Sequence, residues 1–442
     1  MSRLNDRRDT REGLKVITGG RTPLVAAVDL GASKIGCFIM KPDGVRREDG
    51  VVQVAGVAHV RSRGVRRGAI VSLEDAATAL AQAVERAEAM AGVRVSGVVL
   101  TTSGGELSSA RVRAAVSLGA RPIVDQDCSR AIQMALAQAR FAGRRPIHLL
   151  PIAWSVDHQT GVRDPRGMYG QRLGLELLVV SMADTAYATY AHCAEIAHLQ
   201  LEGVVAAPFA SGLAALEEDE MQLGAVCIDM GGGSTSVAVF RGGSLLHVDS
   251  LNVGGAHVTS DIARGFSTTL AGAERLKTLH GSAIASAGED REMVETPPRG
   301  DDPGAAPVVA PRSLLKGIIA PRVEETLELI RDRLIAAGAP LDSATGVVLT
   351  GGASELTGVR EVASRVFDRP VRLGRPRRAP HLADAASGPA FCAAAGVLQR
   401  AAFGPREAAL IKSGPAQSSR SAQAQAYAGP LAKAVGWLRT NL

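Results

Sequence analysis

Two short apolar runs, each followed by an acidic residue and a glycine turn, dominate the pattern of hydrophobic and polar positions. The later run covers residues 225–228 and is followed by Asp229 and the glycines at 231–233, after which a second apolar stretch begins. A continuous apolar run of this length, with β-branched members, is typical of a strand that is covered on both faces. The pattern predicts a buried strand, a tight turn and a second strand over residues 224–240.

The same pattern occurs near the N-terminus, where apolar residues 24–28 precede Asp29 and Gly31. A third, partial copy at 346–354 has a glycine pair but no acidic residue, which suits a base or ribose better than a metal. Strand–turn units that recur along a chain indicate a repeated architecture. We therefore expect two similar halves around one nucleotide.

Glycine turns of this kind suit phosphate, because backbone N–H groups without side chains around them can surround its oxygen atoms. A carboxylate beside the phosphates can hold Mg²⁺ directly or through water, and the candidates are Asp29 and Asp229. Considered alone, one such turn is explained about equally well by an ordinary β-hairpin. The predicted phosphate contacts are Asp29, Gly31, Ala32, Ser33, Lys34, Gly231, Gly232, Gly233, Ser234 and Thr235.

Helical patterns separate these turns. Residues 72–90, 126–142 and 183–198 are expected to form helices, as are residues 311–335 with a break near Pro321, because proline removes a helical hydrogen bond. A glycine turn at 254–255 opens a further helix, whose free N–H groups and positive dipole end would face the nucleotide.

Composition narrows the class of protein. The chain has 442 residues, 46% of them hydrophobic, so it is long enough for more than one domain. Its net charge of +6 is mild for this length, and we expect no nucleic-acid partner. Its five cysteines are scattered without a Cys-x-x-Cys pair, which favours reduced thiols in the cytoplasm. We expect no signal peptide and no membrane-spanning segment.

The two ends of the chain differ from its middle. Residues 1–20 are predicted to be a disordered arm, and residues 401–429 a flexible linker. Residues 430–442 are predicted to form an amphipathic helix of roughly 20 Å, too short to span a bilayer but suited to its interface. A helix docked on the protein's own surface is the alternative. The residues expected to contact the membrane are Leu431, Lys433, Val435, Trp437, Leu438, Arg439 and Leu442.

The three glycine turns resemble the phosphate-one, phosphate-two and adenosine motifs of the actin-like ATPase superfamily. Their order and spacing, together with the terminal amphipathic segment, resemble the FtsA family of bacterial cell-division proteins over about residues 22–400 and at the terminus. The resemblance implies an α/β, actin-like fold, a duplicated ribonuclease H-like fold with two lobes around a nucleotide cleft and an inserted αβ subdomain.

The resemblance also implies a division of the chain into subdomains. The first core subdomain would consist of residues 21–104 and 182–216, and the inserted subdomain of residues 105–181. The second core subdomain would consist of residues 217–262 and 325–400. A small subdomain that binds the FtsZ tail would consist of residues 263–324.

Further site residues follow from the resemblance. Arg322 would contact acidic residues of the FtsZ tail, although an ordinary solvated arginine is nearly as good an explanation. Glu274 and Lys277 lie three residues apart and share a helix face, where a surface ion pair is the plainer explanation. The adenosine contacts would be Gly255, Glu274, Lys277, Gly351, Gly352 and Ala353.

The function that the resemblance implies is a tether. With ATP and Mg²⁺ bound, the protein would polymerise, hold FtsZ filaments at the inner face of the cytoplasmic membrane at the septum, and recruit later division proteins through the inserted subdomain. We expect ATP binding with at most slow hydrolysis, because no residue is identified that positions an attacking water. The alternatives are a sugar or acetate kinase of the same superfamily, a chaperone ATPase and a pilus-assembly relative.

Overall fold

The computed structural model describes residues 24–46, 51–139, 141–285, 291–299, 306–342, 345–377 and 386–403. The chain divides into two compact units, and the described residues of the first lie within 24–111, 141–152 and 178–403. The predicted N-terminal arm, the terminal amphipathic segment 430–442 and all but the first three residues of the predicted linker lie outside the described residues.

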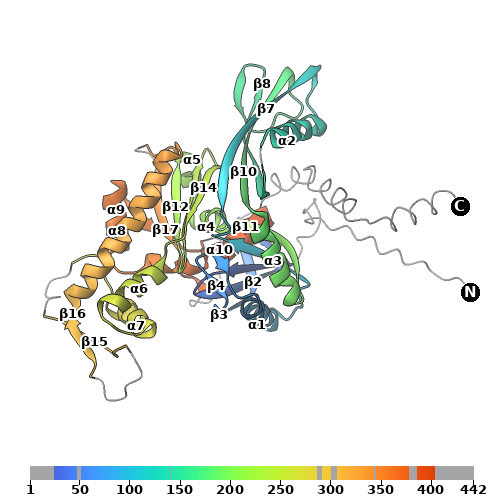
Figure 1. Ribbon diagram of the computed structural model, residues 1–442. Coiled ribbons are helices and arrows are strands. Elements are labelled where there is room, and N and C mark those ends of the chain that lie inside the picture. The colour runs from blue at the N-terminus through green and yellow to red at the C-terminus, as the bar shows by residue number, and fades with distance from the viewer. Residues whose placement is uncertain are drawn as a thin grey trace, which may run out of the picture. The chain divides into compact units, whose positions relative to one another are not determined.

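The first unit contains two five-stranded sheets of the same design (Figure 1). The order of the first sheet is β11–β6–β1–β2–β3, with β1 antiparallel to β2 and parallel to β6. The apolar run predicted as a strand forms β1, which is buried along nearly its whole length because both faces of the sheet are covered. The strands are β1 (Val25–Leu30), β2 (Lys34–Arg46), β3 (Val51–Arg61), β6 (Gly97–Thr102) and β11 (Gln200–Ala206).

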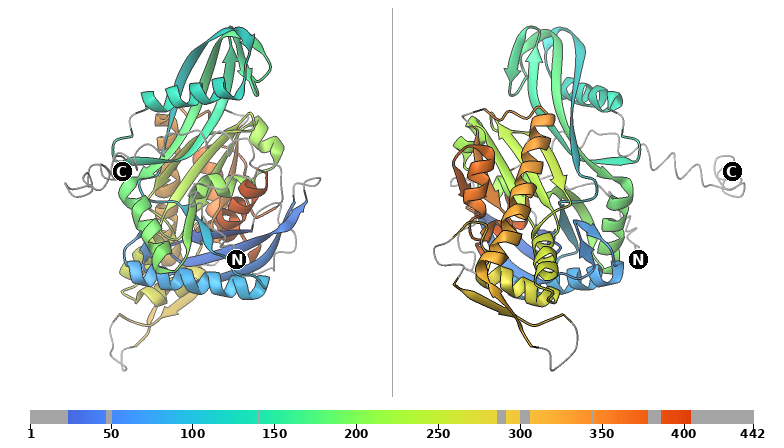
Figure 2. Two further views of the ribbon diagram at one scale, coloured as in Figure 1. Left: turned by 90° about the vertical axis from the view of Figure 1, so that its right-hand side faces the viewer. Right: turned by 60° about the vertical axis from the view of Figure 1, so that its left-hand side comes forward.

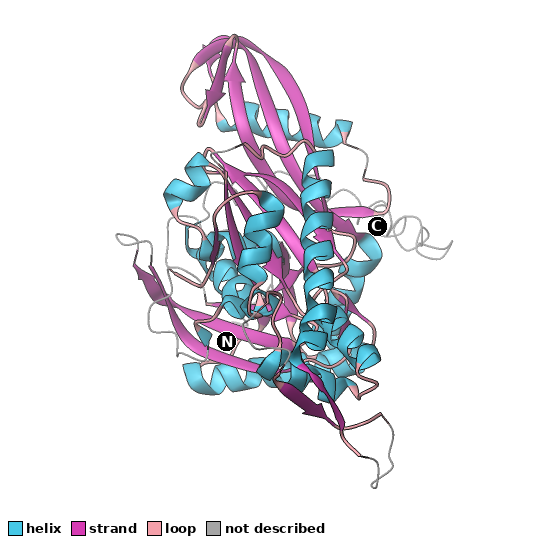
Figure 3. Ribbon diagram, turned by 90° about the vertical axis from the view of Figure 1, so that its left-hand side faces the viewer, coloured by secondary structure: helices cyan, strands magenta, loops and turns pink. Residues whose placement is uncertain are grey.

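The second sheet repeats the pairing of the first. Its order is β14–β13–β12–β17–β18, with β12 antiparallel to β13 and parallel to β17. The predicted duplication and the α/β fold class are therefore confirmed, and Figure 3 shows helices and strands packed together in the molecule. The strands are β12 (Ala225–Met230), β13 (Thr235–Arg241), β14 (Ser244–Leu251), β17 (Gly346–Thr350) and β18 (Val371–Leu373).

Helices cover the sheets and bury three apolar clusters. Helix α1 (Leu73–Ala91) packs on β2 and β3 and contacts α3 (Asp184–Ile196), as the first view of Figure 2 shows for α1. The second sheet packs with α6 (Gly255–Gly265), α7 (Leu270–His280), α8 (Arg312–Ala336) and α9 (Val359–Phe367). The short helix α5 (Glu218–Leu223) precedes β12 and contacts β13.

Two helices rich in small residues cross between the two sheets. Helix α4 (Ala207–Ala215) and helix α10 (Cys392–Phe403) pack on each other, and their apolar cluster includes side chains from both sheets. The backbones approach so closely that a β-carbon on Gly396 would stand 1.7 Å from the carbonyl oxygen of Ala210. Only glycine fits at this crossing.

The small elements complete the first unit. β4 (Val65–Arg66) and β5 (Ala69–Ile70) form a tight ribbon, and β15 (Met293–Thr296) pairs with β16 (Val308–Pro311). A 3-10 turn, η1 (Gly352–Glu355), follows β17. A second one, η3 (Pro389–Phe391), lies directly before α10.

Helix α8 is continuous through Pro321, so the predicted break there is wrong. A proline inside a helix removes one hydrogen bond, but this helix buries a stripe of apolar side chains on both sides of the proline, and that packing outweighs the loss. The same helix runs without interruption across residues 324 and 325, where the predicted subdomain boundary falls. The buried stripe consists of Leu315, Ile319, Val323, Leu327, Ile330 and Leu334.

The second unit holds residues 112–139 and 153–177 of the described chain. Its sheet has the order β7–β10–β8–β9, with helix α2 (Asp125–Gln138) following β7. The buried carboxylate of Asp127 accepts hydrogen bonds from Arg121 and Arg130, so this buried charge is paired. The strands are β7 (Ser108–Pro122), β8 (Arg144–Val156), β9 (Gln159–Val162) and β10 (Tyr169–Ala183).

Within the described residues, no helix is both long enough and apolar enough to cross a membrane.

Candidate functional site

The two acid-bearing turns occupy equivalent positions in the two sheets. The first joins β1 to β2 and the later one joins β12 to β13. Asp29 pairs with Gly36 and Asp229 pairs with Ser236, each one residue before the end of its strand. The shared register places the two acids at corresponding points of the repeated fold.

The two turns touch each other. Gly232 and Gly233 lie so close to the first turn that a side chain would not fit there. A β-carbon added to Gly232 would lie 2.0 Å from Ser33 Oγ, and one added to Gly233 would lie 2.7 Å from the β-carbon of Ala32. The predicted phosphate contacts from opposite halves of the chain are therefore brought together at one place.

The two acids lie partly buried beside this contact. Asp29 accepts a hydrogen bond of 2.5 Å from Thr101 Oγ1, and Asp229 accepts one of 2.6 Å from Ser211 Oγ. Burial raises the pKa of Asp29, opposed by the Thr101 hydrogen bond and by the charge of Lys34. Burial also raises the pKa of Asp229, to about 6, and the charge of Asp29 adds to this rise. The acids are therefore close enough to repel each other, and a cation between them would relieve that repulsion.

Lys34 supplies a cation at the same place. Its Nζ lies 3.0 Å from the centre of the Phe391 ring, a cation–π contact. Burial lowers the pKa of Lys34 to about 8, opposed chiefly by the charge of Asp29 and then by those of Glu355 and Asp229. The ammonium is therefore placed near the turn, against the Phe391 ring and within the electrostatic influence of the three acids.

The N-terminus of α6 supports the later turn rather than facing a ligand. The N–H of Gly255 donates to the carbonyl of Gly231 at 3.0 Å, and that of Ala256 donates to the carbonyl of Gly232 at 2.7 Å. The N–H of Gly254 donates to His257 Nδ1 at 3.1 Å. The prediction that free N–H groups of this helix face the nucleotide is wrong, because these three are already used within the protein.

The predicted adenosine residues also converge. A β-carbon on Gly255 would stand 3.2 Å from that of Ala353 and 3.7 Å from Lys277 Nζ. Lys277 Nζ donates to Thr259 Oγ1 at 2.9 Å and to Glu274 at 2.7 Å, so the Glu-x-x-Lys pair joins α7 to α6.

The neutral glycine turn lies against the later acid. Gly351 has φ of 82°, and a β-carbon there would stand 2.4 Å from Asp229 Oδ1. Both the left-handed backbone and the close approach require glycine at this position. Gly352 begins the 3-10 turn that follows, beside Ala390.

Several residues at the site were not predicted from the sequence. Ser103 Oγ lies 2.8 Å from Ser234 Oγ, and Arg67 has positive φ, 48°, with its backbone against Gly233. Thr101 could have been found, because β6 is the parallel neighbour of β1 and ligands gather at the carboxyl ends of such strands. Ser211 and Phe391 carry no comparable signal.

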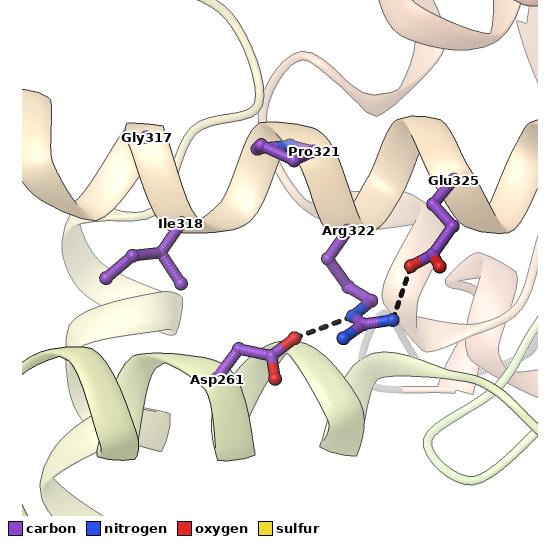
Figure 4. A pocket seen from close by; sticks show the side chains of 6 residues that line it. All are labelled: Asp261, Gly317, Ile318, Pro321, Arg322 and Glu325. Atoms are coloured by element: carbon purple, nitrogen blue, oxygen red, sulfur yellow. Dashed lines mark hydrogen bonds and ion pairs between the residues drawn. The ribbon is translucent and has the colours of Figure 1, made fainter.

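A separate cavity of about 370 Å³ lies between α6 and α8 and includes Arg322 (Figure 4). Arg322 Nε donates to Asp261 at 2.6 Å, and Nη1 donates to Glu325. The predicted partner-binding arginine is therefore about one-third exposed and held by two carboxylates, rather than freely solvated. We call this cavity the α6–α8 pocket; its lining residues are Asp261, Gly317, Ile318, Pro321, Arg322 and Glu325.

Comparison with known proteins agrees with this arrangement. The family model "Cell division protein FtsA" matches residues 226–396, and the model "SHS2 domain inserted in FTSA" matches residues 104–181. The chain is 41% identical over 392 residues to the cell division protein FtsA of Agrobacterium fabrum, covering 87% of this chain and 88% of that protein. It is 31% identical over 382 residues to that of Escherichia coli K12, covering 85% and 89%.

Solved structures support the fold. The chain resembles the PilM–PilN type IV pilus biogenesis complex with a TM-score of 0.60 and 18% identity, covering 86% of this chain and 99% of that one. It resembles MreB5 of Spiroplasma citri bound to ADP with a TM-score of 0.50 and 14% identity, covering 85% and 95%. At this identity the likeness concerns the actin-like fold alone. The fold, the paired acid-bearing turns and the sequence matches together place the chain in the FtsA family of actin-like cell division proteins.

Proposed function

We propose that this chain binds ATP, polymerises, and tethers FtsZ filaments to the inner face of the cytoplasmic membrane at the division septum. The observation that carries the proposal is the meeting of two equivalent Asp–glycine turns and a neutral glycine turn at one place. Membership of the FtsA family supports the assignment to cell division.

The residues present suit ATP with Mg²⁺. Mg²⁺ prefers oxygen ligands and is commonly held by one or two carboxylates together with phosphate oxygens and water. Asp29 and Asp229 supply two partly buried carboxylates, and the metal would neutralise the charge that their partial burial makes costly. Among the described residues, no group of three or more His, Cys, Asp or Glu side chains is arranged to hold a metal ion.

Each part of the nucleotide has a counterpart. Backbone N–H groups of the two turns and Lys34 would bind the phosphates, and the Glu274–Lys277 pair with Gly255 and Ala353 would lie beside the ribose and base. We infer binding with at most slow hydrolysis, because we assign no residue that positions an attacking water.

We propose the α6–α8 pocket as the site of the FtsZ tail. Arg322 uses Nε and Nη1 for its ion pairs to Asp261 and Glu325. These ion pairs do not use the two N–H donors on Nη2, which could therefore bind a carboxylate of an acidic partner. Pro321, which lines the pocket together with Gly317, has no N–H to donate to the carbonyl of Gly317 four residues earlier, so that carbonyl lacks its usual helical partner. A peptide with acidic and apolar residues fits these groups and the side chain of Ile318.

We propose that residues 430–442 bind anionic membrane and that self-association adds avidity to this weak contact. Later division proteins would bind the inserted subdomain.

Calorimetric titration of ATP into the full chain, with and without Mg²⁺, tests the nucleotide part. We expect binding that Mg²⁺ strengthens, and loss of that strengthening in Asp229→Asn. A matched control is Asp184→Asn, which removes a half-exposed acid at the start of α3. If the unaltered chain fails to bind ATP at millimolar concentration, the proposal is wrong.

A further inference from the structure

We propose that α6 links the nucleotide turn to the α6–α8 pocket, with Asp261 as the positioning residue, so that bound ATP tightens the pocket's grip on an acidic tail. This rests on the proposed function, because it requires ATP at the turns and a tail in the pocket.

One end of α6 is fastened to the nucleotide turn. The N–H groups of Gly255 and Ala256 donate to the carbonyls of Gly231 and Gly232. A β-carbon on Gly254 would stand 2.5 Å from the carbonyl oxygen of Gly231, so the backbones are in direct contact as well. A movement of the turn must therefore move the first turn of α6.

The same helix forms one wall of the α6–α8 pocket. Asp261 lies one helical turn beyond His257 and accepts the Nε–H of Arg322 at 2.6 Å. Near the end of α6, a β-carbon on Gly265 would stand 2.4 Å from the Ile318 side chain of α8. Figure 4 shows Asp261 reaching across to Arg322, beside Ile318. The helix spans only 11 residues, so it moves as a short rigid rod between the two sites.

The direction of the effect follows from the chemistry of the peptide group. The carbonyl of Gly231 and the N–H of Gly232 belong to one peptide unit, and the carbonyl of Gly232 and the N–H of Gly233 belong to the next. When phosphate accepts from these N–H groups, it polarises both units and makes their carbonyls stronger acceptors. The bonds to α6 then strengthen, and Asp261 is held where it orients Arg322. Bound ATP therefore favours the arrangement that receives an acidic tail.

Asp261 and Glu325 provide a matched pair of variants. Both carboxylates bind Arg322, but Asp261 lies on α6 and Glu325 lies on α8, the helix of Arg322 itself. Asp261→Asn removes the charge that strengthens the bond to Arg322 and should therefore weaken the link to the nucleotide turn. Glu325→Gln should alter the charge around Arg322 and leave the link in place.

The experiment measures the Kd of a labelled acidic FtsZ tail peptide for the full chain by fluorescence anisotropy, with and without ATP and Mg²⁺. We expect ATP to tighten peptide binding at least about fivefold, and the peptide to tighten ATP binding by the same factor. The ratio of the two peptide Kd values should fall close to one in Asp261→Asn. In Glu325→Gln both Kd values should shift and their ratio should persist.

The outcomes separate the two proposals. If the chain binds both ligands but the peptide Kd is unaffected by ATP, or if Asp261→Asn keeps the full ratio, the link is wrong and the proposed function stands. If the chain binds neither ligand, the proposed function fails and the link fails with it.

Amide hydrogen exchange of the unaltered chain gives a second measurement that needs no variant. ATP should slow exchange in the first turn of α6, and unchanged exchange there in the presence of saturating ATP would overturn the link.

Discussion

Lys34 Nζ lies 3.0 Å from the centre of the Phe391 ring, so a residue of the first turn is held by a ring just before α10. The same ammonium is acted on by the charges of Asp29 and Asp229. In the proposed complex it changes partners and binds phosphate.

Replacing Lys34 by methionine should lower ATP affinity about tenfold, because a charge-assisted bond to phosphate is lost while the apolar contact with Phe391 is kept. Calorimetric titration measures the change. Lys41→Met, on the same strand β2, is the control and should bind ATP as the unaltered chain does. Equal affinities in the two variants would contradict a phosphate contact by Lys34.

Gly254→Ala should abolish measurable ATP binding. The added β-carbon would stand 2.5 Å from the carbonyl oxygen of Gly231 and 2.8 Å from the backbone nitrogen of Ser234, so the phosphate turn must shift. Gly36→Ala in β2 meets nothing within 4 Å and serves as the control. ATP binding by Gly254→Ala at the affinity of the control would show that the position of this turn does not matter for the nucleotide.

Gly396→Ala should destabilise the fold by about 1–3 kcal/mol or more, because the β-carbon would overlap the carbonyl of Ala210 where α4 and α10 cross. Gly317→Ala in α8 is also a helical substitution but meets nothing within 4 Å, so it should be neutral or raise stability by up to about 1 kcal/mol. Urea unfolding measures both free energies. The prediction fails if the two variants change stability by the same amount.

His247 should make the stability of the chain fall as the pH drops below about 6.5, the usual pKa of histidine. Protonation of Asp229, whose folded pKa is raised to about 6 by burial, acts in the opposite direction at the lower end of this range. Burial lowers the pKa of His247 in the folded state, aided by Arg111 and opposed by Asp249. Its Nδ1 lies 3.2 Å from Ser109 Oγ, and its Nε2 is buried without a partner among the described residues. The unfolded chain therefore binds a proton that the folded chain resists.

Melting temperatures measured between pH 7.5 and 5.5 test this dependence. His247→Gln should flatten the fall in melting temperature, whereas His158→Gln, at an exposed position, should leave it unchanged. An unaltered slope in His247→Gln would exclude this histidine as the cause.

The sequence was sufficient to predict the features that depend on local pattern. Short apolar runs predict the strands that end near Asp29 and Asp229. Glycines, which permit unusual backbone angles, predict the turns after them. The duplication follows from the repetition of that pattern, and the two sheets confirm it.

Other features depend on contacts between distant elements. The bond between Ser103 and Ser234 joins residues 131 positions apart. Ser234 was predicted as a phosphate contact, but no local pattern pairs it with Ser103. The N–H groups at the start of α6 were expected to face a ligand, but they donate hydrogen bonds to carbonyls of the neighbouring turn. The continuity of α8 through Pro321 likewise depends on apolar packing along the whole helix, which a local rule about proline does not include.

The measurement that tests the account most directly is co-sedimentation of FtsZ with anionic vesicles in the presence of ATP and Mg²⁺. The full chain should carry FtsZ to the vesicles, and a chain truncated after Gly429 should bind FtsZ but leave it in the supernatant. Recruitment by the truncated chain equal to that by the full chain, or no recruitment by either, would contradict the tether.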